Sequence, residues 1–167
     1  IFPSQWQFAA SALREADVIV SCVDSYAARQ DIEATARRFL IPLIDIGMDV
    51  HLTENKPYIV GQVILSMPEG PCMKCLGFLN EDRLKQEADQ YGGAGDRPQV
   101  VWTNGVLASV AVGIVVDLLT GWKSLRRHGE YLHYDGNTFE LSRSPRLEFA
   151  PATCIHFPLE EIGEPRV

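Results

Sequence analysis

Asp17-Val-Ile-Val-Ser-Cys-Val-Asp24-Ser25 decides the fold, because it is a run of β-branched apolar residues that ends in an acid. Such a run is typical of a buried parallel strand. Residues 26–40 follow with a helical pattern, and residues 41–46 form the next apolar run. A strand, a helix and a strand within about thirty residues predict a βαβ unit, and therefore an α/β fold.

Asp24 is the first candidate for a functional residue. Ligands of open α/β sheets bind beyond the carboxyl ends of the strands, and Asp24 lies at such an end. The alternative is that Asp24 only caps the N-terminus of the following helix. Arg29 lies about one turn further on, where it either faces the same crevice or is a solvated helix charge. The local pattern leaves both alternatives open for each residue.

Charge and cysteine content narrow the class of protein. The net charge of −7 over 167 residues argues against nucleic acid as the main partner. Four cysteines, no signal-peptide pattern and no polybasic run indicate a reducing compartment, so we expect a cytoplasmic protein. The chain opens at Ile1, and no strand precedes the βαβ unit. We therefore expect residues 1–167 to be a single-domain fragment of a longer protein.

Further elements are predicted from local patterns on both sides of the βαβ unit. They are a short helix at 5–15, a polar turn at 51–57, a strand at 58–65, a polar helix at 81–91, a flexible linker at 92–98, and a β-hairpin at 131–141 with Asp135-Gly136-Asn137 at its turn.

Residues 105–120 form the most apolar helical segment. It is shorter than a bilayer span and contains Asp117, which favours a buried helix over a transmembrane one, so no membrane partner is expected. Its small residues allow close packing against a sheet or a partner helix. These are Gly105, Ala108, Ser109, Ala111 and Gly113.

Cys72-Met-Lys-Cys75 follows the tight turn at 68–71 and is typical of a zinc knuckle. It supplies two ligands, and Cys154-Ile-His156 is the one other Cys/His cluster. Together they would complete a tetrahedral Cys₃His zinc site. The alternatives are a thioredoxin-like redox pair and two unrelated buried thiols. His51, His128 or His133 could also take the place of His156.

The order of these motifs resembles the C-terminal half of the ThiF/MoeB/HesA family, the relatives of ubiquitin-activating E1 enzymes. The resemblance covers roughly residues 16–122. It implies the C-terminal part of a Rossmann-like E1 adenylation fold, with a mixed sheet and a terminal β-hairpin. The matching pieces are the stretch 17–25, Arg29, the strand at 41–46, Gly61-Gln62-Val63, Cys72-x-x-Cys75 and Thr103-Asn104-Gly105-Val106.

The resemblance implies ATP-dependent adenylation of the C-terminal carboxylate of a ubiquitin-like or sulfur-carrier protein. ATP and Mg²⁺ would be the cofactors, beside the structural zinc ion expected from the Cys/His motifs, and the protein would be a homodimer. Asp24 matches the aspartate that serves magnesium and the nucleotide, and is the implied catalytic residue. Arg29 matches the arginine on the next helix. Ser25, in place of the usual Asn, would complete the nucleotide-binding set.

The chain also departs from the family pattern. The Gly-rich nucleotide loop, the ribose-binding acid and the phosphate-contacting Arg and Lys lie upstream in the family and are not present here, so we expect this fragment alone to be inactive. Residues 76–104 contain no cysteine, so a thioester is not expected in this segment. Two other functions stay open. One is an NAD-dependent oxidoreductase fragment with Asp24 on a ribose, and the other is a zinc-stabilised interaction module.

Overall fold

The computed structural model describes residues 12–53, 56–89, 100–123, 129–159 and 162–163. The expected linker at 92–98 lies outside the described residues. Of the expected helix at 5–15 only residues 12–15 are described, and they form a 3₁₀ turn. The strands are β1 (Ile19–Ser21), β2 (Leu43–Thr53), β3 (Lys56–Ser66), β4 (Glu130–Asp135) and β5 (Glu140–Arg143), and the helices are α1 (Tyr26–Arg38), α2 (Glu81–Asp89), α3 (Val101–Thr120) and α4 (Arg146–Phe149).

The five strands form one mixed sheet in the order β1-β2-β3-β4-β5. β1 and β2 pair in parallel and the other pairs are antiparallel, which confirms both the βαβ unit and the terminal hairpin β4–β5. The chain reverses within the predicted polar turn at 51–57, but that prediction is too long, because β2 runs to Thr53 and β3 begins at Lys56, with His51 opposite Tyr58. Backbone hydrogen bonds hold this ladder, so polar side chains can continue it.

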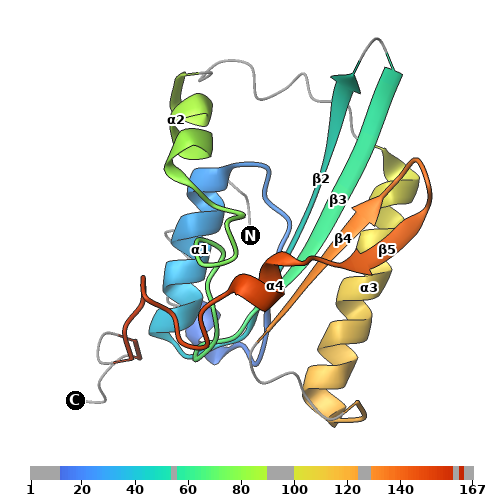
Figure 1. The fold of residues 1–167 in the computed structure, drawn as a ribbon. Coiled ribbons are helices and arrows are strands. Elements are labelled where there is room, and N and C mark those ends of the chain that lie inside the picture. The colour runs from blue at the N-terminus through green and yellow to red at the C-terminus, as the bar shows by residue number, and fades with distance from the viewer. Residues whose placement is uncertain (1–11, 54–55, 90–99, 124–128, 160–161, 164–167) are drawn as a thin grey trace.

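The helices cover both faces of the sheet, with α1 on one face and α3 on the other (Figure 1). Neighbouring residues of a strand point to opposite faces. Leu43 and Ile64 therefore pack into the apolar cluster on the α1 side, while Ile44 and Val63 pack into the cluster on the α3 side. All four are buried. The near-continuous apolar runs of the sequence thus reflect a sheet that is covered twice.

Helix α3 packs on the sheet through one face only. A Cβ atom added at Gly61 of β3 would lie 2.6 Å from Leu107 Cδ1, so the glycine permits the close approach of this helix. Thr103, Leu107 and Ala111 are its buried residues. The prediction of a buried helix therefore holds for the side that faces the sheet. It is wrong for the outward face, which no described element covers. In the described part of the chain, α3 alone is long and apolar enough to cross a membrane, a test that core helices also pass.

Candidate nucleotide site and metal centre

Asp24 lies three residues after the last residue of β1, beyond the carboxyl end of this parallel strand, and its side chain is exposed. No hydrogen bond or ion pair joins that side chain to another residue in the part of the chain that the structure describes. The N-cap of α1 is Ser25, whose Oγ accepts a hydrogen bond from the Ala28 N–H at 3.2 Å. The capping alternative for Asp24 is therefore wrong, because the next residue fills that position.

The first turn of α1 also donates hydrogen bonds to a carboxylate of α2. Glu87 accepts hydrogen bonds from the Tyr26 N–H (2.9 Å), the Ala27 N–H (3.0 Å) and the Ser25 hydroxyl (3.2 Å). A negative charge stabilises a helix N-terminus, where backbone N–H groups lack intrahelical partners. The sequence indicated only a polar helix here, and no local signal connects residues about sixty positions apart.

Arg29 is buried on the sheet side of α1, with 5% of its surface exposed. It forms an ion pair with the fully buried Asp45 of β2, and its guanidinium lies 5.7 Å from the centre of the Phe78 ring. The alternative of a solvated helix charge is therefore wrong. The apolar run at 41–46 contained a signal for this pairing, because it includes an acid, and an acid inside a buried strand needs a partner.

The surroundings of this ion pair are tightly packed. A Cβ atom at Gly47 would lie 2.7 Å from Arg29 Nη2 and 2.3 Å from Gln62 Nε2, so a larger residue here would have to move the ends of both side chains. Burial raises the pKa of Asp45 from 3.8 to about 6, although Arg29 acts to lower this pKa. The desolvation of the carboxyl therefore outweighs its attraction to Arg29.

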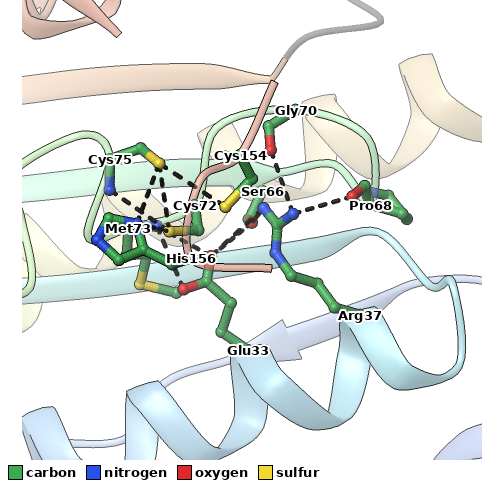
Figure 2. Close-up of polar contacts among 10 residues, drawn as sticks. All are labelled: Glu33, Arg37, Ser66, Pro68, Gly70, Cys72, Met73, Cys75, Cys154 and His156. Atoms are coloured by element: carbon green, nitrogen blue, oxygen red, sulfur yellow. Dashed lines mark hydrogen bonds and ion pairs between the residues drawn. The ribbon is translucent and has the colours of Figure 1, made fainter. Parts of the chain in front are cut away.

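The structure brings the four predicted metal ligands together from the knuckle and the C-terminal segment (Figure 2). Their ligand atoms all lie within 4.8 Å of one another. Cys75 Sγ is 3.6 Å from Cys72 Sγ and 3.7 Å from Cys154 Sγ. His156 Nδ1 is 3.4 Å from Cys72 Sγ and 3.3 Å from Cys75 Sγ. Two unrelated buried thiols are therefore excluded as an account of Cys72 and Cys75.

These separations fit a tetrahedral zinc ion. With zinc–sulfur and zinc–nitrogen bonds of about 2.3 and 2.05 Å, sulfur atoms would stand about 3.8 Å apart, and sulfur and nitrogen about 3.6 Å apart. The four distances given above differ from these values by no more than about 0.3 Å. Three thiols and one imidazole are also the donor set of structural zinc sites.

Among the described histidines, His156 lies in the cluster with the three cysteines and the other candidates do not. His51 lies on β2 opposite Tyr58, and His133 lies on β4 opposite Gln62, outside the described metal cluster. His128 lies outside the described residues. Cys72 is fully buried, and burial together with the negative charge of Glu33 raises the pKa of its thiol. A metal ion would therefore have to displace the proton of this thiol on binding.

Comparisons with known proteins concern the family and the fold of the chain. The sequence model described as "ThiF family" matches residues 3–154. A comparison with curated proteins finds no match. Among solved structures, the Escherichia coli protein MccB, crystallised with succinimide, superposes with a TM-score of 0.55 at 15% identity over 85% of this chain and 42% of that chain. Selenomethionine PaaA gives 0.50 at 14% identity over 83% and 45%.

The likeness to these two proteins concerns the fold alone, a Rossmann-like α/β fold. The chain spans less than half the length of either protein. The motifs at 17–25, 61–63, 72–75 and 103–106, taken in this order, were thus sufficient to identify the fold from sequence.

Proposed function

We propose, from the premise that the chain belongs to the ThiF family, that the protein is an ATP-dependent adenylyltransferase. One observation carries this proposal. Asp24 presents an exposed carboxylate, with no partner among the described residues, at the carboxyl end of β1. This edge of an open α/β sheet is where ligands bind.

The reaction joins a carboxylate of the substrate to the α-phosphoryl group of ATP and releases pyrophosphate. Asp24 would bind Mg²⁺, which prefers carboxylate oxygens and offsets phosphate charge. Arg29 is already paired with Asp45, so it supports this role by holding α1 against β2. Contacts of Arg29 and of the N-cap residue Ser25 with the nucleotide stay predictions. We further propose that the substrate is the C-terminus of a ubiquitin-like or sulfur-carrier protein.

The test is a titration of the full-length protein with nucleotides, followed by ATP–pyrophosphate exchange in the presence of a candidate carrier protein. Adenylation requires binding of ATP with Mg²⁺ and exchange that depends on the carrier. Binding of NAD without ATP would instead support an oxidoreductase. Failure to bind either nucleotide would leave a zinc-stabilised interaction module.

We also propose that the protein is a homodimer in which two copies of α3 pack together. The outward face of α3 carries small residues towards its start and larger apolar residues towards its end, with Val112, Val116 and Leu119 between 46% and 62% exposed. A Cβ atom added at Gly105 or Gly113 would meet nothing within 4 Å, so the backbone is open to close approach there. A two-fold axis would bury this face against its own copy.

Replacing Val112 with glutamate should weaken this dimer at least about tenfold, because the charge would be buried at the interface. Sedimentation equilibrium measures the shift. Phe149→Glu is the matched control, since Phe149 is 85% exposed on α4, away from α3 (Figure 1), and should leave association unchanged. A wild-type protein that sediments as a monomer would contradict the dimer. If this monomer also sediments together with lipid vesicles, the α3 face would be assigned to a membrane.

A further inference from the structure

Helix α1 contacts the metal centre as well as the candidate nucleotide site. Arg29, Glu33 and Arg37 follow one another at intervals of four residues, so they share one face of the helix, and all are buried. Arg29 reaches β2, while Glu33 and Arg37 reach the knuckle and the segment before it (Figure 2).

Glu33 binds the backbone of the knuckle between its two cysteines. Its Oε1 accepts a hydrogen bond from the Met73 N–H at 3.0 Å, and Oε2 lies 3.2 Å from the same nitrogen. Oε1 also accepts from the Ser66 hydroxyl at 2.6 Å. Both Glu33 and Met73 are almost completely buried. The carboxylate thus ties the start of the knuckle to the end of β3.

Arg37 holds the segment that leads into the knuckle and also contacts the C-terminal segment. It donates hydrogen bonds to the carbonyl oxygens of Pro68 (2.9 Å) and Gly70 (3.2 Å), and to the Ser66 hydroxyl (2.8 Å). Its guanidinium lies 5.2 Å from the centre of the Phe157 ring, next to the ligand His156. Polar contacts therefore fix the knuckle, whereas the C-terminal segment receives an aromatic contact from this residue.

We propose that Glu33 is a positioning residue that preorganises the knuckle, so that Cys72 and Cys75 keep their metal-binding geometry before the metal arrives. This inference rests on the metal centre of the proposed function. The knuckle also closes on itself, through hydrogen bonds from the Leu76 N–H to the Cys72 carbonyl and from the Phe78 N–H to the Met73 carbonyl, both 2.9 Å. Metal loss therefore releases residues 154–157 and leaves the knuckle folded.

The first experiment measures zinc affinity by competition with a chromogenic chelator. Glu33→Ala should weaken zinc binding about 10- to 100-fold, the usual effect of removing a partner that orients a metal ligand. Glu33→Gln should bind within about threefold of the wild type, because its carbonyl oxygen can take the place of Oε1, which receives both short hydrogen bonds. Asp31→Ala, on the exposed side of the same helix, is the control and should have no effect.

The second experiment uses the wild-type protein, so it does not depend on the folding of a variant. After zinc is removed with a chelator, amide hydrogen exchange should accelerate at least about tenfold at residues 154–157 and less than about threefold at Met73. Loss of Met73 protection together with the C-terminal segment would overturn the inference, as would normal zinc affinity in Glu33→Ala. Absence of zinc from the wild type would instead overturn the metal centre, and the inference with it.

Discussion

Replacement of Asp24 with alanine should reduce ATP–pyrophosphate exchange by the full-length protein about 100-fold or more, because the variant loses the carboxylate that would bind Mg²⁺ against the phosphates. The fold should stay intact, since the side chain is exposed and has no partner among the described residues. Exchange of labelled pyrophosphate into ATP measures the first effect, and thermal unfolding measures the second.

Asp17→Ala is the matched control for this variant. Asp17 is also an exposed acid next to β1, but it lies at the opposite end of the strand, where no ligand is expected. Its exchange rate should therefore equal that of the wild type. Near-normal exchange by Asp24→Ala would remove Asp24 from the site. Asp24→Asn should behave like Asp24→Ala, because a neutral amide offsets little of the charge of the metal.

Substitution of Cys154 with serine should lower zinc affinity more than about 100-fold. Loss of a residue that only hydrogen-bonds a metal ligand already costs up to about 100-fold, and Cys154 would be a ligand itself. Protein purified without chelator should contain about one zinc ion per chain, and the variant should lose it on dialysis. Four protein ligands leave no open position for water, so we expect a structural ion. The variant should also unfold at a lower temperature, because the zinc connects the C-terminal segment to the knuckle.

The control is Cys22→Ser, because Cys22 is exposed and stands outside the metal cluster of the described residues. It should retain zinc and thermal stability. Metal analysis by mass spectrometry and thiol counting decide between the alternatives. A wild-type protein without metal, in which Cys72 and Cys75 form a disulfide under reducing expression, would make the knuckle a redox pair.

Local sequence patterns were sufficient to predict most strands and helices. The β-branched run at 17–25 predicted β1, and the apolar runs at 41–46 and 58–65 predicted the start of β2 and most of β3. They failed at 51–57, where backbone pairing extends both strands through polar residues. The two short motifs at 72–75 and 154–156 were also sufficient to name the four residues that meet at the metal centre.

Only the tertiary structure decided the roles of the charged residues on α1. Arg29 pairs with Asp45, and Glu33 accepts a hydrogen bond from the Met73 N–H. The first turn of the helix donates a hydrogen bond to the carboxylate of Glu87. Spacing along the chain could not show these contacts, because each joins residues that become neighbours only when separate elements pack. Burial then makes a partner necessary for each charge, since an unpaired buried charge is strongly unfavourable.

Helix α3 also combines a property that the sequence predicts with one that only the tertiary structure decides. Its apolar composition was evident from sequence, but composition does not say how many sides of a helix are covered. The sheet buries Leu107 and Ala111 and leaves Val112 and Val116 exposed, because one helix can contact a sheet through only one of its faces. The sequence by itself thus determined the elements, the family resemblance and the four Cys/His residues that gather in one cluster, while the packing of the elements determined which polar groups are paired and which apolar face stays exposed.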